Sequence, residues 1–257
     1  MLTYYITDRN QYAGGEGERR SQLLRTMGQA AAAGVDFIQL REKDLAIRQL
    51  EALAREALGV IRSEGSARLL INHRTDVALA VGADGVHLTG NDIAAGDARA
   101  LAVRSGMLSH LSRESGGEGG APGSHMQGAT QLRHFLVAVS CHTAEQLRLA
   151  EAHGADFAVF APVFEKMRSE DVTGETRVIR EGVGVEELRR AARQTPASDA
   201  RVEAGGLRGT FPVFALGGVD RKRAPLCAAA GAAGIAGIRI FQQCGDLAQL
   251  VRWLREL

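Results

Sequence analysis

The chain has 257 residues, of which 45% are hydrophobic, so it is long enough to bury the core of a complete α/β domain. Its formal net charge of +1 argues against nucleic acid or an anionic membrane surface as the main partner. The 3 cysteines form no C-x-x-C pair, no apolar run is long enough to span a bilayer, and the first residues lack a signal peptide. We therefore expect a reduced, cytoplasmic protein.

One phrase recurs along the chain: a helix tail of small residues, a glycine, and then a short apolar run. The copies are AAAGVDFIQL (31–40), LAVGADGVHL (79–88), EAHGADFAVF (151–160) and AAAGAAGIAGI (228–238). A glycine ends each helix because it adopts a left-handed backbone without the strain of a Cβ. The run that follows is short and apolar throughout, which is typical of a strand buried on both faces in a parallel sheet.

In chain order, the pattern predicts 8 strands that alternate with helices. The strands are expected at 2–7, 36–40, 68–71, 85–88, 135–139, 156–160, 211–215 and 235–240. The helices are expected at 19–33, 46–63, 75–81, 93–104, 143–153, 185–194, 220–230 and 246–256. This repeat predicts a single (β/α)8 TIM barrel over residues 1–257. An open doubly wound sheet is the alternative, but no G-x-G-x-x-G motif follows the first strand.

Two stretches interrupt the repeat, at approximately 112–129 and 195–210. Both are rich in glycine and other small residues and have no apolar periodicity, so we expect flexible Gly-rich insertions between barrel elements. Neither carries an aromatic residue or a dense basic cluster, and a functional lid is therefore the less favoured interpretation.

Polar residues gather where the predicted strands end, which is where TIM barrels carry their chemistry. After the second strand, alternation predicts that Gln39, Arg41 and Lys43 share one side and converge over the barrel mouth as an anion clamp. A solvated charge cluster at the start of the next helix is the alternative. The later strand ends add Asn72, His73, Asp92, Ser140, His142 and Lys166.

A phosphate site is expected after the seventh strand. Gly217 and Gly218 lie there, at the place where TIM barrels commonly bind phosphate through backbone N–H groups and a helix N-terminus. Arg239, expected within the apolar eighth strand beside them, would add a fork of hydrogen-bond donors. A tight turn without a ligand is the alternative for the paired glycines.

The chain resembles the thiamine-phosphate synthases and their TenI-type relatives, the thiazole tautomerases, which are barrels of this kind. The matching phrases are YYITDR (4–9), IQLREKD (38–44), INHRTDVALAVGADGVHL (71–88), VSCHTAEQLRLAEAHGADFAVFAPVFEK (139–166) and FALGGV (214–219). They follow one another in the family order and leave out only the insertions. The resemblance implies an enzyme of thiamin biosynthesis that acts on small phosphorylated thiazole or pyrimidine substrates, and it leaves a homo-oligomer open.

The family contains two activities. The synthase, a transferase, joins a hydroxymethylpyrimidine pyrophosphate to a thiazole phosphate and releases pyrophosphate with the help of Mg²⁺. The tautomerase, an isomerase, aromatises a thiazole carboxylate phosphate by moving a proton, without metal. By resemblance, Arg41 and Lys43 match the family's pyrophosphate-binding R-E-K, and Asn72 matches its asparagine.

Several departures from the synthase pattern favour the tautomerase. His73 replaces the first of two magnesium-binding aspartates and leaves Asp92 as the second, although Mg²⁺ prefers oxygen ligands to imidazole. Residues 165–168, E-K-M-R, replace the family's T-x-T-K, and Arg239 replaces a serine. We therefore expect no cofactor, with Mg²⁺ held at Asp92 only if the synthase alternative applies.

His142 is the main catalytic candidate. It matches the family's S-x-H motif, which supplies the proton-moving histidine of the tautomerase, and an imidazole titrates near neutral pH. Synthases often carry a histidine here too, and a structural histidine at a helix start is the alternative. His73 offers a second proton carrier. A tautomerase is thus the first interpretation, a synthase the second, and a non-catalytic barrel that only binds a thiamin-related phosphate the third.

Overall fold

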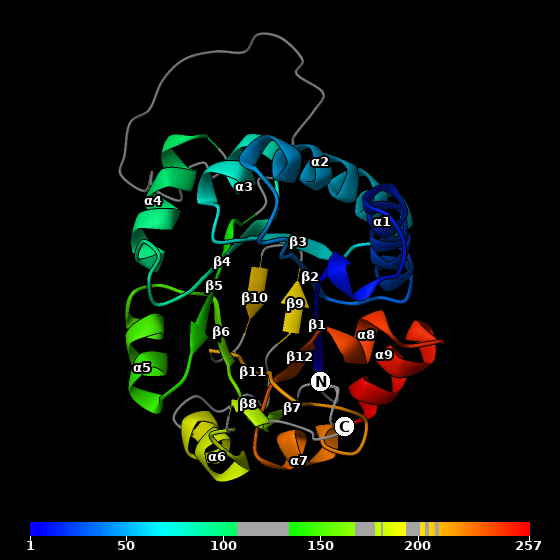
Figure 1. Cartoon of the computed structure of the whole chain (residues 1–257). Helices are drawn as coiled ribbons and strands as arrows, with labels where there is room; N and C mark the ends of the chain where they lie inside the picture. Colours follow the sequence, from blue (N-terminus) through cyan, green and yellow to red (C-terminus); the bar gives the residue numbers. More distant parts are fainter. Residues whose placement is uncertain (107–133, 168–177, 181, 194–200, 204–205, 209–210) are drawn as a thin grey trace, which may run out of the picture.

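A computed structural model describes residues 1–106, 134–167, 178–180, 182–193, 201–203, 206–208 and 211–257 of the chain. Its main feature is a closed barrel of parallel strands with helices around it, in the order β1-β2-β3-β4-β5-β6-β11-β12 (Figure 1). This arrangement confirms the predicted TIM barrel. Within the described ranges, no helix combines the length and the apolar character needed to cross a membrane.

Each expected barrel strand and helix has a counterpart in the structure. The barrel strands are β1 (Leu2–Ile6), β2 (Phe37–Leu40), β3 (Arg68–Asn72), β4 (Gly85–Leu88), β5 (Leu136–Cys141), β6 (Phe157–Phe160), β11 (Val213–Ala215) and β12 (Gly234–Gly237). The helices are η1 (Arg9–Gln11, 3-10), α1 (Glu16–Ala32), α2 (Ile47–Glu64), α3 (Thr75–Val81), α4 (Ala95–Arg104), α5 (Ala144–Ala152), α6 (Val185–Arg193), α7 (Ala224–Ala229), α8 (Arg239–Gln242) and α9 (Leu247–Glu256).

The eighth strand is shorter than expected. β12 ends at Gly237, Ile238 has a helical backbone with φ −96° and ψ −73°, and Arg239 begins the short helix α8 with an exposed side chain. The prediction that Arg239 lies within the strand was therefore wrong. The physical reason is that a short apolar run is compatible with a buried strand and with a buried helical turn, and its periodicity does not separate them.

Two small antiparallel sheets lie outside the barrel. β7 (Lys166–Met167) pairs with β8 (Val178–Arg180), and β9 (Arg201–Glu203) pairs with β10 (Gly206–Arg208). The second sheet falls within the insertion at 195–210, where no regular element was expected. Val202 lies opposite Leu207 in the strand register, so part of this insertion has a regular backbone that its composition alone did not reveal. The insertion at 112–129 lies outside the described residues.

Aromatic rings fill the barrel interior. Tyr4, Phe37, Phe157 and Phe214 are fully buried, and their ring centroids lie 5.0–5.9 Å apart in tilted or edge-to-face arrangements. Because alternate residues of a strand face the same side, positions two residues further along each strand also point inward, nearer the carboxyl end. On β2, β4 and β5 the inward-facing positions near this end carry the polar residues Gln39, His87 and Ser140, whereas on β1 and β6 they are apolar.

Candidate active site

A line of polar side chains connects the aromatic interior with the carboxyl end of β5. The His87 ring on β4 lies with Nδ1 3.0 Å from the Tyr4 hydroxyl and Nε2 2.7 Å from Ser140 Oγ. His87 is 3% exposed, and burial, with smaller contributions from His73 and Arg41, lowers its pKa to about 3. The imidazole is therefore neutral at neutral pH.

Ser140 is among the site residues predicted from the sequence, whereas His87 is not. A signal was present: in the buried run GVHL, the histidine alternates with Gly85 and so shares its inward-facing side. A histidine at such a position must find partners inside the barrel, since a buried polar side chain without hydrogen bonds destabilises the fold. Asn72, the last residue of β3, lies opposite His87 in the strand register.

We expect the fold to lose stability in acid because of His87. The unfolded chain takes up a proton near the ordinary histidine pKa of 6.5, whereas the folded protein does so only near 3. Lowering the pH from 7 to 4 therefore favours the unfolded state, by about 3 kcal/mol. Urea unfolding as a function of pH measures this loss. The variant His87→Gln should lose less stability in acid than the wild type, and the exposed His153→Gln should behave like the wild type.

The loops after β3 and β4 meet through a side-chain hydrogen bond. His73 Nδ1 lies 2.6 Å from Asp92 Oδ2, and the same oxygen accepts hydrogen bonds from Thr89 N (2.6 Å) and Thr89 Oγ1 (3.0 Å). Burial acts to raise the pKa of Asp92, but the hydrogen bonds from His73 and Thr89 outweigh it, so the pKa is lowered. His73 also has a φ of 62°, which is uncommon for a residue other than glycine and occurs preferentially at functional sites.

The side chains around Asp92 do not supply the oxygen ligands that a magnesium site built by the protein alone would need. One carboxylate oxygen already accepts three hydrogen bonds, and an imidazole occupies the place of the family's other carboxylate. Mg²⁺ requires nearly octahedral oxygen coordination. Across the described part of the chain, no group of three or more His, Cys, Asp or Glu residues is arranged to hold a metal ion.

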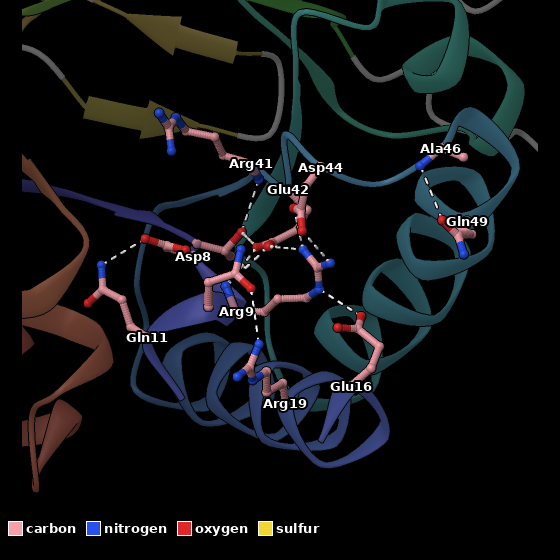
Figure 2. Close-up of polar contacts among 12 residues, drawn as sticks. Asp8, Arg9, Gln11, Glu16, Arg19, Arg41, Glu42, Asp44, Ala46 and Gln49 are labelled. Atoms are coloured by element: carbon pink, nitrogen blue, oxygen red, sulfur yellow. Dashed lines mark hydrogen bonds and ion pairs between the residues drawn. The ribbon is translucent and has the colours of Figure 1, made fainter. Parts of the chain in front are cut away.

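The loop after β2 is held by a buried arginine (Figure 2). Arg9 Nη1 lies 3.1 Å from Glu42 Oε2, and the two side chains are only 5% and 1% exposed. The Arg9 guanidinium also contacts Asp44 at 2.7 and 2.8 Å and Glu16 at 2.7 Å. Hydrogen bonds from Arg9 lower the pKa of Asp44 to about 2. The loop is thus fixed to the segment that follows β1.

Buried and exposed side chains follow one another in the loop after β2. β2 ends at Leu40, and beyond it Glu42 is buried while Lys43 is exposed. Gln39 is buried within the barrel and Arg41 is half-buried, so the three residues differ in exposure, and the expectation that they share one side stays a prediction. As phosphate ligands, these three residues stay predictions. Figure 2 shows the Arg41 side chain extending away from the buried Arg9 network.

His142 lies where β5 ends and α5 begins. Its Nδ1 contacts the backbone carbonyl of Ala161, which follows β6, and its backbone N–H donates to Gln146 Oε1 at 2.7 Å. Thr143 caps α5 by accepting from Gln146 N at 3.2 Å. A carbonyl accepts only from a protonated nitrogen, so Nδ1 carries a proton, and in the neutral ring Nε2 is the atom that can accept one.

Gly217 and Gly218 follow β11 in left-handed conformations, with φ of 102° and 63°. They pack against the loop after β6, where Phe164 N donates to the Gly217 carbonyl at 3.0 Å. Lys166 begins β7 after the same loop. Arg239 on α8 is exposed, so the expected phosphate site retains the paired glycines but not an arginine within the eighth strand.

We expect Gly217→Ala to destabilise the protein by about 1–3 kcal/mol, because it adds backbone strain and a clash. A Cβ at Gly217 would lie 2.7 Å from Pro162 Cα, and its φ of 102° disfavours every L-residue with a side chain. Gly59→Ala is the matched control, since nothing lies within 4 Å of its Cβ position inside α2. That variant should gain about 0.5–1 kcal/mol. Urea unfolding of both variants measures these changes. The prediction would be contradicted if both variants gained, or both lost, unfolding free energy.

Comparison with known proteins identifies the family. Residues 3–110 and 124–241 match the family described as thiamine monophosphate synthase. A relative from Geobacter sulfurreducens, provisionally named a thiamine-phosphate synthase, is 37% identical over 91% of this chain and 83% of its own. The thiamine-phosphate synthase of Methanoculleus marisnigri is 30% identical over 98% of this chain and 93% of its own.

A solved structure shares the fold. The thiamine phosphate pyrophosphorylase from Pyrococcus furiosus superposes with a TM-score of 0.65 at 24% identity, covering 99% of this chain and 94% of that chain. The family match, the relatives and the barrel together confirm the resemblance seen in the sequence. The chain belongs to the thiamine monophosphate synthase family, whose members serve thiamin biosynthesis.

Proposed function

We propose that this enzyme joins a hydroxymethylpyrimidine pyrophosphate to a thiazole phosphate and releases pyrophosphate. The observation that carries the proposal is the similarity, at 30% identity over nearly the whole chain, to proteins named thiamine-phosphate synthase. The departures at His73 and residues 165–168 led us to expect the tautomerase first. The comparisons favour the synthase alternative instead. In that case, this chain is a synthase in which the residues at these positions differ from the family pattern.

The proposed roles follow from charge and position. Pyrophosphate leaves with an electron pair, so donors aimed at its oxygens lower the barrier of the reaction. Arg41 and Lys43, on the loop after β2, supply positive charge, and Ser140 at the end of β5 supplies a hydroxyl donor. Gly217 and Gly218 offer backbone N–H groups to the thiazole phosphate. Asn72 orients the pyrimidine substrate from the end of β3.

The test is a direct assay of the purified protein. It is mixed with both substrates and Mg²⁺, and the formation of thiamine phosphate and of pyrophosphate is followed over time. Equal amounts of both products support the proposal. Tight binding of the thiazole phosphate without any product would support the non-catalytic barrel, and the absence of both binding and product would exclude the family chemistry.

A second candidate is the thiazole tautomerase, and two observations favour it. The Nδ1 contact of His142 with the Ala161 carbonyl leaves Nε2 to accept a proton, and His73 pairs with Asp92 where the synthase pattern has two carboxylates. An aromatisation assay with the thiazole carboxylate phosphate, run with and without a chelator, separates the two reactions. Full turnover in chelator would favour the tautomerase over the synthase.

If the tautomerase reaction is present, His142→Gln should lower it at least 100-fold, in the range usual for loss of a general acid–base residue. The melting temperature should stay near that of the wild type, since His142 is only half-buried. Gln146→Ala is the matched control, because it removes the partner of the His142 backbone but keeps the imidazole. Aromatisation at wild-type rates in His142→Gln would rule out this role.

A further inference from the structure

We propose that His87 is a positioning residue that turns the hydroxyl proton of Ser140 toward the barrel mouth. The inference rests on the proposed role of Ser140 as a donor to the phosphorylated substrate. It starts from the line of hydrogen bonds in which His87 bridges Tyr4, inside the barrel, and Ser140, at its carboxyl end.

The surroundings of Tyr4 decide the first bond. Its ring is completely buried and packs against the rings of Phe37, Phe157 and Phe214, none of which accepts a conventional hydrogen bond from a hydroxyl. Burial raises the pKa of Tyr4, so the phenol keeps its proton and needs an acceptor, and His87 Nδ1 lies 3.0 Å from the phenol oxygen. His87 Nδ1 is then the acceptor for the phenol proton.

The second bond follows from the first. A neutral imidazole has one protonated and one unprotonated nitrogen, so an accepting Nδ1 places the proton on Nε2. Nε2–H then donates to Ser140 Oγ at 2.7 Å. The serine oxygen is occupied as an acceptor on the side of the imidazole, and its own proton points elsewhere. The hydroxyl is thereby oriented as a donor at the rim of the barrel, as an anionic oxygen requires.

The opposite tautomer would have the opposite effect. With the proton on Nδ1, Ser140 would donate inward to Nε2 and would present only lone pairs to a phosphate oxygen. Nitrogen NMR of the ¹⁵N-labelled protein reports which ring nitrogen carries the proton. We expect protonated Nε2 in the wild type and a mixture of tautomers in Tyr4→Phe. Protonated Nδ1 in the wild type would overturn the proposal, and this measurement needs no substrate.

Two variants of His87 test the consequence for turnover. His87→Gln keeps a donor at about the place of Nε2, whereas His87→Leu removes it but keeps the buried volume filled. We expect kcat of His87→Gln to stay within about fivefold of the wild type, and kcat of His87→Leu to fall roughly 10- to 100-fold with KM little changed. Leu136→Ala is the control for lost packing, because Leu136 is buried in the same barrel interior. Its melting temperature should fall while its kcat stays near the wild-type value.

The outcomes separate this proposal from the proposed function. Equal losses of kcat in His87→Gln and His87→Leu, or a similar loss in Leu136→Ala, would overturn the positioning role. If the wild type forms no product at all, the proposed function fails. The positioning role of His87 is then tested by calorimetry, which measures the binding of inorganic pyrophosphate. His87→Leu should bind this probe about tenfold more weakly than His87→Gln. Equal affinities of the two variants would overturn the proposal.

Discussion

Ser140→Ala is expected to lower kcat for thiamine phosphate formation by about 100- to 1,000-fold, the usual effect of removing one donor to a developing oxyanion. The side chain is small and half-buried at the end of β5, but its loss leaves Nε2 of the buried His87 without its partner, so the unfolding free energy should fall by about 1–3 kcal/mol. Steady-state kinetics with both substrates measures the effect. KM for the pyrimidine pyrophosphate should change less than kcat, because the hydrogen bond strengthens as the leaving group gains charge.

Ser140→Thr keeps the hydroxyl and serves as the matched variant. It should retain more activity than Ser140→Ala, since His87 Nε2 can still donate to the threonine oxygen. A Ser140→Ala enzyme with more than a tenth of the wild-type kcat would show that this hydroxyl does not assist the leaving group. In that case Arg41 and Lys43 would remain as the proposed source of stabilisation.

Arg9→Leu is expected to lower the unfolding free energy by about 3–5 kcal/mol, because it leaves the Glu42 carboxylate buried without its partner. The Glu42 side chain is 1% exposed, and its remaining acceptor contacts are with Thr7 Oγ1 at 2.6 Å and the Arg9 backbone N–H. Burial already raises the pKa of Glu42 above its ordinary value of 4.5 despite Arg9. Without the guanidinium the pKa should rise further, so the deficit should grow as the pH increases from 4 to 7.

Two further variants make the stability measurement specific. Replacing both partners, as Arg9→Leu with Glu42→Leu, should restore part of the loss, because no unpaired charge then stays buried. Arg20→Ala breaks an ion pair with Glu56 whose side chains are 29% and 53% exposed, and it should cost less than about 1 kcal/mol. Urea unfolding of all three would contradict the argument if Arg9→Leu lost no more than Arg20→Ala.

The same network has a consequence for the site. The backbone N–H of Arg41 donates to Thr7 Oγ1 at 2.9 Å, and Thr7 in turn donates to Glu42, so Arg9 and Glu42 hold the backbone from which Arg41 extends (Figure 2). The sequence predicted this loop as a source of cations. It did not reveal that Glu42, between the two cations, is the buried residue, because strand alternation ends at Leu40.

The sequence by itself determined the barrel and the family. Strands and helices follow from local patterns, such as the glycine that ends a helix and the apolar run that forms the next strand, and repetition of these patterns predicts a closed parallel sheet. Errors appeared where local patterns are ambiguous: Arg239 begins α8 after a short apolar run, and residues 201–203 and 206–208 pair as β9 and β10 within a stretch that has no apolar periodicity.

Only the tertiary structure decided which polar groups meet. Tyr4 and His87 lie 83 positions apart, His87 and Ser140 lie 53 apart, and His73 and Asp92 come from two different loops. Hydrophobic periodicity acts over a few residues and specifies which side of a strand is buried. A hydrogen bond across the barrel depends instead on strand register and on closure of the sheet, which bring β1, β4 and β5 around one interior.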